Sequence, residues 1–250
     1  MKPKKPKLYG LIGRNIHYSF SASYFKNKFE KLGLIHCTYQ NFDIQNIEQL
    51  KQVLSGNKKI KGLNVTIPYK EDVIPLLNKL SKTAKTIGAV NTIAISKKGI
   101  LKGYNTDHYG FRKSLKPLLK PHHKKALILG TGGASKAVAY ALRRLKIEYD
   151  FVSRTATESI FSYSQLKSDI FEEYTIIINT TPLGTNPDTE NCPPLDYSLF
   201  TPQHIAYDLV YNPQNTTFMQ KAAQQGATVK NGYDMLVLQA EKAWRIWNSK

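Results

Sequence analysis

Apolar and polar positions follow two periods along the chain, and these predict strands and helices that succeed one another. Short apolar runs bounded by turn residues are typical of buried strands, and they occur at 7–13, 37–42 and 62–66. Apolar residues spaced by three or four positions predict helices at 21–32 and near 47–54, and helical segments from 69 to about 86. The chain therefore opens as strand, helix, strand, helix, strand.

The same patterns continue through the rest of the sequence. Residues 88–93 and 99–104 predict short strands or a hairpin, and a helix is expected from about 106 to 119. After Pro121 the pattern starts again with a strand at 125–130 and a helix whose apolar face holds Val138, Ala141, Leu142 and Leu145. The remaining expected elements are a strand at 148–153, a helix near 164–171, a strand at 174–179, a proline-containing loop, a strand at 204–210, and helices at 216–225 and 233–248.

Strands that alternate with helices over the whole length indicate an α/β protein. Two parallel strands must be joined by a crossover connection, which is usually a helix, so the alternation predicts parallel, doubly wound sheets. No solenoid-type repeat and no low-complexity linker interrupts the pattern.

The composition places the chain among globular proteins. Of its 250 residues, 41% are hydrophobic and 11% aromatic, which is enough to bury a core. Cys37 and Cys192 lie far apart and the six histidines contain no His-x-x-x-His pair, so neither a disulfide framework nor a metal site is expected. No apolar run is long enough to span a bilayer, and residues 1–7 lead into only a short apolar segment, so we expect a cytoplasmic location.

The formal net charge of +18 raises nucleic acid or an anionic membrane as partners. However, the lysines are scattered along the whole length apart from a basic start and one patch at 116–125, and no basic motif is interleaved with aromatic residues. We therefore expect neither nucleic acid nor a membrane as partner. The charge instead favours small anionic molecules, because it raises their concentration near a cleft.

A glycine-rich turn indicates a dinucleotide site. Leu127-Ile-Leu-Gly130-Thr-Gly132-Gly133-Ala-Ser135 stands where a predicted strand meets a predicted helix. Glycines there let the backbone approach a pyrophosphate, and the start of the helix supplies free N–H groups.

The end of the next strand indicates which dinucleotide is bound. NAD is selected there by an acid on the ribose hydroxyls, whereas NADP is selected by an arginine on the 2′-phosphate. The sequence reads Phe151-Val-Ser153-Arg154-Thr155, whose arginine and hydroxyls can receive a phosphate, while Asp150 falls inside the strand and is expected to point away. We therefore predict a preference for NADP.

Polar clusters follow several strands of the first half, where open α/β sheets place their ligands. They are Ser19-Phe-Ser21, Asn64-Val-Thr66-Ile-Pro-Tyr-Lys70, Ala89-Val-Asn91-Thr92 and Asn105-Thr-Asp107. Each has an ordinary structural interpretation when it is taken singly, as a helix N-cap, a turn former or a helix start.

Taken together, the clusters and the glycine turn resemble the shikimate dehydrogenase family along nearly the whole chain. Eight motifs carry the resemblance: Ile12-Gly-Arg-Asn-Ile-His-Tyr-Ser-Phe-Ser21, Asn64-Val-Thr-Ile-Pro-Tyr-Lys70, Gly88-Ala-Val-Asn-Thr92, Asn105-Thr-Asp107, Gly130-Thr-Gly-Gly-Ala-Ser135, Ser153-Arg-Thr155, Asn179-Thr-Thr181 and Gly232-Tyr-Asp-Met-Leu-Val-Leu-Gln239. The resemblance implies the reversible reduction of 3-dehydroshikimate to shikimate with NADPH, on the pathway to chorismate and the aromatic amino acids.

The family also implies two domains with a cleft between them. Residues 1–104 plus 232–250 correspond to a substrate-binding and catalytic domain with a mostly parallel sheet, to which the last helix returns. Residues 105–231 correspond to an NADP-binding Rossmann domain. A monomer and a homodimer both remain open.

Carried over position by position, the resemblance makes Lys70 and Asp107 the catalytic pair. It assigns the substrate to Ser19, Ser21, Thr66, Asn91, Tyr211 and Gln239. It assigns the cofactor to Gly130, Gly132, Gly133, Ala134, Ser153, Arg154, Thr155, Thr180, Leu209 and Gly232. A lysine paired with a carboxylate suits this reaction, because hydride transfer to a ketone leaves an alkoxide that needs a proton donor.

Two departures from the family pattern and two alternative functions stand beside this interpretation. Family members commonly read His-Ser-x-Ser-Pro where this chain reads Tyr18-Ser-Phe-Ser-Ala22, and many carry Asn at the position of Ser153. The alternatives are a quinate/shikimate dehydrogenase with broader substrate use or NAD preference, and a catalytically silent regulator that senses metabolites of the same pathway. A silent regulator is expected to have lost the Lys70 and Asp107 pair, which this chain keeps.

Overall fold

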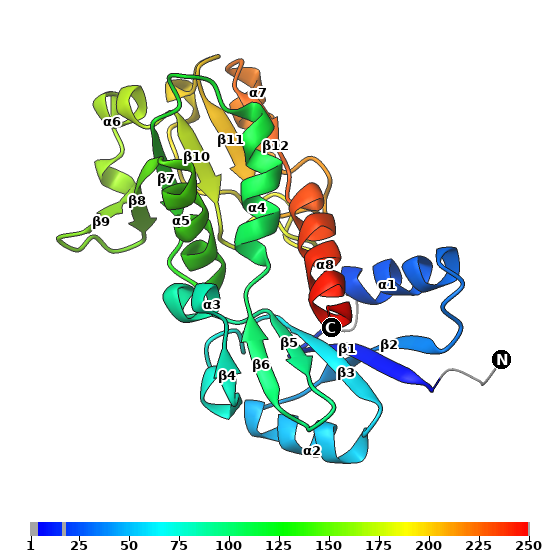
Figure 1. Cartoon of the computed structure of the whole chain (residues 1–250). Coiled ribbons are helices and arrows are strands. Elements are labelled where there is room, and N and C mark those ends of the chain that lie inside the picture. The colour runs from blue at the N-terminus through cyan, green and yellow to red at the C-terminus, as the bar shows by residue number, and fades with distance from the viewer. Residues whose placement is uncertain (1–4, 17–18, 250) are drawn as a thin grey trace. The chain divides into compact units, whose positions relative to one another are not determined.

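The computed structural model describes residues 5–16 and 19–249, so His17 and Tyr18 of the first motif lie outside the described residues (Figure 1). The chain forms two compact units, one built from residues 1–106 and 240–250 and the other from residues 107–239. The sequence-based domains change at 104/105 and at 231/232, so the second junction in the structure comes eight residues later, inside the last helix.

The first unit is a six-stranded sheet in the order β2-β1-β3-β5-β6-β4. It is mostly parallel, but β5 runs antiparallel to both of its neighbours, β3 and β6, and it forms a hairpin with β6 over residues 92–104. Such a hairpin needs no crossover helix, which is why the alternation of elements lapses here. The strands are β1 (Lys7–Gly13), β2 (Cys37–Asp43), β3 (Ile60–Val65), β4 (Lys79–Leu80), β5 (Thr92–Ile95) and β6 (Leu101–Tyr104).

Helices cover both faces of this sheet (Figure 1). On one face an aromatic cluster from β1, α1 and the end of α8 surrounds Tyr9, and Trp247 closes it by donating its indole N–H to the carbonyl of Ile93 at 3.0 Å. On the other face α2 packs its apolar side against β1 and β3. The elements are α1 (Phe20–Lys31), η1 (Ile47–Gln49), α2 (Leu50–Gly56), η2 (Ile74–Leu76) and α3 (Lys82–Ile87).

The second unit is an all-parallel sheet in the order β12-β11-β10-β7-β8-β9. Read from the other edge this is the 3-2-1-4-5-6 order of a dinucleotide-binding fold, with its switch point between β7 and β10. The strands are β7 (Lys125–Leu129), β8 (Glu148–Ser153), β9 (Ile160–Ser162), β10 (Ile176–Asn179), β11 (Ile205–Asp208) and β12 (Thr228–Lys230).

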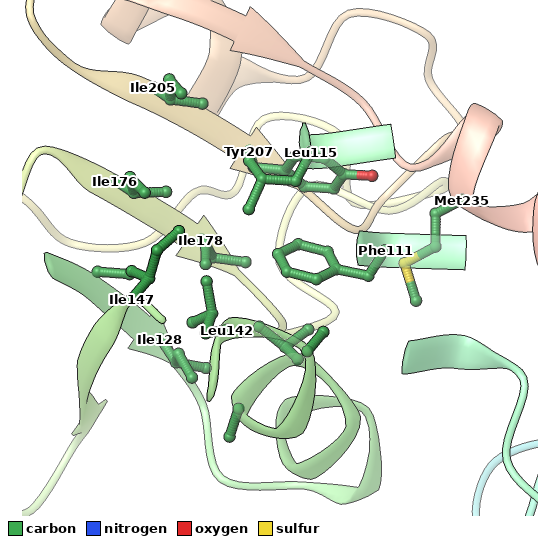
Figure 2. Close-up of a cluster of buried hydrophobic side chains, with 14 residues drawn as sticks. Phe111, Leu115, Ile128, Leu142, Ile147, Ile176, Ile178, Ile205, Tyr207 and Met235 are labelled. Carbon is green, nitrogen blue, oxygen red and sulfur yellow. The ribbon is translucent and has the colours of Figure 1, made fainter. Parts of the chain in front are cut away.

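The core of the second unit lies on both sides of this sheet. On one side, α4, α5 and the start of α8 bury aromatic and aliphatic side chains, of which Figure 2 shows Phe111, Tyr207 and Met235 converging over the strands. On the other side, α6 and α7 pack against β10 and β11. The helices are α4 (Asp107–Leu115), η3 (Lys116–Leu118), α5 (Gly133–Leu145), η4 (Tyr163–Gln165), α6 (Ser168–Glu173), η5 (Tyr197–Leu199), α7 (Thr217–Gln224) and α8 (Tyr233–Asn248).

The structure corrects the sequence prediction in two segments and adds two strands. Residues 69–86 are not mainly helical: a turn leads into η2 and β4 before α3 begins, because Pro75 lacks the N–H that a continuing helix needs. The helix expected near 164–171 divides into η4 and α6. The strands β9 and β12 have three residues each, too few to show a period in the sequence.

In the described part of the chain, no helix combines the length and the apolar character needed to cross a bilayer. Within residues 5–16 and 19–249, no three His, Cys, Asp or Glu side chains gather in a group that could hold a metal ion.

The crossing of α4 and α8 in the second unit depends on a glycine. A Cβ on Gly110 would lie 2.4 Å from the carbonyl oxygen of Met235, far inside van der Waals contact. We expect Gly110→Ala to lower the free energy of unfolding by about 1–3 kcal/mol, because the two backbones must separate. Urea unfolding followed by circular dichroism measures this change.

Gly56→Ala is the matched control, because an added Cβ meets no atom within 4 Å at the end of α2. It should leave stability unchanged or raise it by up to about 1 kcal/mol, as alanine is the better helix former. Equal unfolding midpoints for Gly110→Ala and the unaltered chain would contradict the close crossing of the two helices.

Candidate active site

The substrate-side candidates of the first unit lie at the carboxyl ends of β1 and β3. These strands are neighbours, and their connections leave in opposite directions, β1 toward β2 and β3 away from it, which makes this a switch point of the sheet. Thr66 donates its N–H to the carbonyl of Ile12 at 2.9 Å, and Arg14 donates to the carbonyl of Ile67 at 3.3 Å. The residues that follow β1 and those that follow β3 are thus hydrogen-bonded to one another. Ser19 comes after the first of these segments in the chain, and Thr66 and Lys70 belong to the second.

A carboxylate at the end of β2 fixes the loop after β1. The backbone N–H groups of Asn15 and Ile16 donate to the two oxygens of Asp43 at 3.0 and 3.2 Å. Asn15 has φ of 58°, a left-handed conformation that asparagine adopts more readily than most residues. The described end of this loop is Ser19, which is also the N-cap residue of α1.

A buried polar network joins the ends of β3, β5 and β6. The oxygen of the Asn91 side chain accepts from the Thr106 N–H at 2.7 Å and from the Thr92 hydroxyl at 3.1 Å, and its amide group donates to the Thr106 hydroxyl at 3.0 Å. Asn64 donates from its side chain to the Asn91 carbonyl and to the Thr92 hydroxyl, both at 3.3 Å. Three of the four predicted polar clusters therefore meet in one place.

Lys70 lies in a turn rather than on the helix that the sequence predicts. Its carbonyl accepts the N–H of Val90 at 2.7 Å, which ties the turn to the residue before Asn91. The side chain is half-buried. Asp107 is buried, is the first residue of α4 and belongs to the second unit, but it follows Thr106 directly in the chain. Hydrogen bonds within the first unit thus fix the backbone of Lys70 and the residue before Asp107 to the same network.

Tyr39 is a residue of this site that the sequence interpretation missed. Its hydroxyl donates to the Asn64 side-chain oxygen at 2.8 Å, and it is also hydrogen-bonded to Ser21. Burial raises the pKa of this phenol, an effect that the bond to Ser21 partly offsets, so the hydroxyl remains a donor. The signal in the sequence was a tyrosine within a strand that mixes apolar and polar residues, and this does not distinguish a site residue from a surface one.

The glycine turn of the second unit fits the phosphates of a dinucleotide. Gly130 has φ of +102°, and a Cβ there would lie 3.0 Å from the Thr180 hydroxyl. Gly132 precedes α5, and a Cβ on it would meet no atom within 4 Å, so the space before the helix is open. The N–H groups of the first turn of a helix lack partners within the helix, and they favour an anion there. Ser135 is buried and turns inward, donating to the Gly132 carbonyl at 2.6 Å.

The turn after β8 presents its basic residue outward. Ser153 accepts the N–H of Thr155 at 3.2 Å and donates to its carbonyl, which closes a tight turn with Arg154 exposed at its tip. Asp150 lies inside β8, and its carboxylate accepts a hydrogen bond from the hydroxyl of Tyr174, at the end of α6, at 2.6 Å, as expected for an acid that points away from the turn. A phosphate can reach Arg154, whereas Asp150 is held elsewhere.

The remaining candidates follow β10 and β11 or lie on α8. Thr180 is bonded by its N–H and its hydroxyl to the Leu129 carbonyl, at 3.0 and 2.6 Å, beside the glycine turn. Leu209 packs its backbone against Gly232, where any Cβ would clash with the Leu209 carbonyl. Tyr211 is half-buried and Gln239 is buried, and the backbone N–H of Gln239 lies 3.2 Å from the Cβ position of Gly110.

Comparison with known proteins gives the family. Residues 11–93 match the model of the shikimate dehydrogenase substrate binding domain. A shikimate dehydrogenase (NADP(+)) from Caldanaerobacter subterraneus subsp. tengcongensis is 38% identical over 98% of this chain and 92% of its own.

Two solved structures show the same fold. The crystal structure of shikimate dehydrogenase from Aquifex aeolicus has a TM-score of 0.86 at 35% identity, over 99% of this chain and 94% of its own. The Thermus thermophilus shikimate 5-dehydrogenase in complex with NADP(H) and shikimate has a TM-score of 0.85 at 32% identity, over 97% and 93%. The similarity extends over both sheets and both sets of candidate residues, so the chain belongs to the shikimate dehydrogenase family.

Proposed function

We propose that this chain catalyses the reversible, NADPH-dependent reduction of 3-dehydroshikimate to shikimate, a step of aromatic amino acid and chorismate biosynthesis. The observation that carries the proposal is the similarity, over nearly its whole length, to a relative named shikimate dehydrogenase (NADP(+)). The relative from Thermus thermophilus, crystallised with NADP(H) and shikimate, supports the same ligands here. The proposed domains are a substrate-binding unit and a cofactor-binding unit.

Hydroxyl and amide groups of the first unit suit a substrate that carries several hydroxyls and a carboxylate. We assign Ser19, Ser21, Thr66 and Asn91 to substrate binding, together with Tyr211 and Gln239. The hydrogen bonds of Ser21 to Tyr39 and of Asn91 to Thr106 support the assignment, since they hold these side chains in fixed orientations before substrate arrives.

Lys70 and Asp107 are the proposed catalytic residues. When bound, NADPH supplies the hydride. The Lys70 ammonium donates a proton to the oxygen of the reduced carbonyl in the forward direction and takes it back in reverse, while the Asp107 carboxylate orients the ammonium and the ring hydroxyl. The hydrogen bond from the Val90 N–H to the Lys70 carbonyl supports this role, because proton transfer requires a positioned donor and this bond fixes the backbone of Lys70.

Cofactor binding is assigned to the glycine turn Gly130, Gly132, Gly133 and Ala134, the selecting turn Ser153, Arg154 and Thr155, and the contacts Thr180, Leu209 and Gly232. A dehydrogenase with quinate activity or NAD preference is the alternative within the family. The cytoplasmic location and the choice between monomer and homodimer stay predictions.

An assay of nicotinamide absorbance tests the function and the alternative together. Shikimate and quinate are each offered with NADP⁺ and with NAD⁺, and four initial rates are measured. We expect shikimate with NADP⁺ to give the highest rate. A higher rate for quinate, or for NAD⁺, would favour the alternative, and the absence of any rate would favour the silent regulator.

Replacing Lys70 should affect turnover much more than binding. We expect Lys70→Ala to lower kcat by about 10²–10⁴-fold with little change in the KM for shikimate, because general acid–base assistance contributes that much. Steady-state kinetics with NADP⁺ measure both constants. The matched control is Lys98→Ala, an exposed lysine of the turn before β6, which should retain full activity. Near-normal turnover of Lys70→Ala would remove this residue from the mechanism.

Replacing Arg154 should change the choice of cofactor. We expect Arg154→Ala to raise the KM for NADPH by about 10- to 100-fold and to leave the KM for NADH unchanged, since a charge-assisted hydrogen bond to the 2′-phosphate contributes about 1.5–3 kcal/mol. Arg144→Ala, an exposed arginine at the end of α5, is the control. Equal losses with both cofactors would speak against a contact with the 2′-phosphate.

Removing the Tyr39 hydroxyl should weaken substrate binding selectively. We expect Tyr39→Phe to raise the KM for shikimate about tenfold, with kcat and the KM for NADP⁺ unchanged, because it leaves the buried Asn64 oxygen without this donor. Tyr149→Phe, whose ring packs edge-on against Phe151, is the control. An unchanged KM for shikimate would show that Tyr39 does not position the site.

A further inference from the structure

A buried carboxylate stands at the centre of the second unit's ligand edge. Asp208 is the last residue of β11 and is fully buried. Its Oδ1 accepts from the Asn179 side-chain amide and from the Val210 N–H, both at 3.0 Å, and its Oδ2 accepts from the Thr216 hydroxyl at 2.6 Å. One carboxylate therefore accepts from the end of β10, from the residues that follow β11, and from the start of α7.

Each of these three bonds leads to a segment with a proposed role or to a helix start. Asn179 uses its side-chain oxygen to accept from the N–H and the hydroxyl of Thr181, at 3.0 and 2.6 Å, which sets the segment containing Thr180. Val210 is the neighbour of both Leu209 and Tyr211, and its carbonyl accepts the N–H of Gly232 at 3.1 Å. The orientation of the Asn179 and Asp208 side chains thus affects six assigned or adjoining positions: Thr180, Thr181, Leu209, Val210, Tyr211 and Gly232.

The third bond reaches α7. Thr216 caps this helix by accepting the N–H of Met219 at 3.3 Å while its own proton goes to Asp208. The hydroxyl is therefore committed as a donor toward the carboxylate. All three partners of Asp208 are donors, so the charged carboxylate can accept from each of them. The neutral acid carries a proton of its own, which would point toward a group that already donates.

We propose that Asp208, in its charged form, is the positioning residue that holds the Asn179–Thr181 and Leu209–Tyr211 segments in the arrangement that binds NADP. It touches neither substrate nor cofactor in this role and acts through Asn179, Val210 and Thr216. The inference rests on the proposed function for the identity of the ligand, and the observations that carry it are the three bonds and their continuation to Thr180, Thr181 and Gly232.

The charge state of Asp208 is sensitive to pH near neutrality. Burial raises the pKa of Asp208 to about 6, although the bonds from Thr216, Val210 and Asn179 oppose the rise. Among titratable groups, the Tyr197 hydroxyl of η5 interacts electrostatically with Asp208, and burial raises the pKa of that phenol, so it stays neutral. The Lys221 ammonium of α7 lies over the Tyr197 ring, and the Cys192 thiol is hydrogen-bonded to both Tyr197 and Lys221. The carboxylate is thus charged above about pH 6 and neutral below it.

Calorimetric titration with NADP⁺, without substrate, tests the proposal between pH 5 and 8. We expect Asp208→Asn to weaken NADP⁺ binding about tenfold at pH 7, because the amide group of asparagine is itself a donor and cannot accept from all three partners. Protonation of Asp208 in the unaltered chain at pH 5 should weaken binding in the same way. The 2′-phosphate titrates in the same range in every variant, so the difference between the variant and the unaltered chain reports Asp208. That difference should disappear at pH 5.

Three further variants give the controls. Asp196→Asn removes another acid of the second unit, an exposed one bonded to Ser198, and should keep the unaltered pH profile. Thr216→Val deletes one of the three bonds and should weaken NADP⁺ binding severalfold, whereas Thr216→Ser keeps the hydroxyl and should restore it. If Asp208→Asn does not fold, the pair at Thr216 decides the question.

Two results would overturn the proposal: an Asp208→Asn protein whose NADP⁺ affinity and pH profile match the unaltered chain, or a Thr216→Val protein that binds as tightly as Thr216→Ser. Kinetics with shikimate at saturating NADP⁺ add a second readout, in which the KM for shikimate rises through Tyr211. A chain that binds NADP⁺ with the expected pH dependence but does not oxidise shikimate would refute the proposed function and leave this role of Asp208 intact.

Discussion

Hydrogen bonding at the ends of strands is the constraint on which the candidate residues of each unit depend. Where a strand ends inside the protein, its last backbone N–H and C=O groups lack partners in the sheet, and buried polar groups must find hydrogen-bond partners elsewhere. In the first unit the Asn91 side chain accepts the N–H of Thr106. In the second unit the Asn179 side chain donates to Asp208 and accepts the N–H of Thr181. The same bonds that satisfy the backbone therefore also fix the side chains assigned to substrate and cofactor.

Close backbone approach is the second constraint, and glycine makes it possible. Gly62 lies under the indole of Trp247, Gly110 under the backbone of Met235 and Gly232 against Leu209, at distances that no Cβ could occupy. Gly132 differs, because the space before it is open. Gly62 and Gly110 thus serve packing and Gly232 allows the close approach to Leu209, whereas Gly132 leaves open space at the start of α5.

Much of the fold could be predicted because it repeats a simple pattern. The strands β1, β7 and β8 are continuous apolar or half-buried runs with turn residues at both ends, and α5 and α8 keep apolar faces at helical spacing, so local sequence determines them. The pattern failed where a proline interrupted helical spacing, at 69–86, and where strands of three residues pair only because a neighbouring strand offers its edge.

The sequence by itself determined the residue types of the candidate site: a lysine after a strand end, a glycine turn between strand and helix, and an arginine after the next strand. Those signals are local, since each depends on a few consecutive residues. Only the tertiary structure decided that Tyr39 joins Ser21 to Asn64, that Lys70 sits in a turn bonded to Val90, and that Asp208 receives three donors. These contacts link positions far apart in the chain, and no local period carries information about which distant donor will reach a buried acceptor.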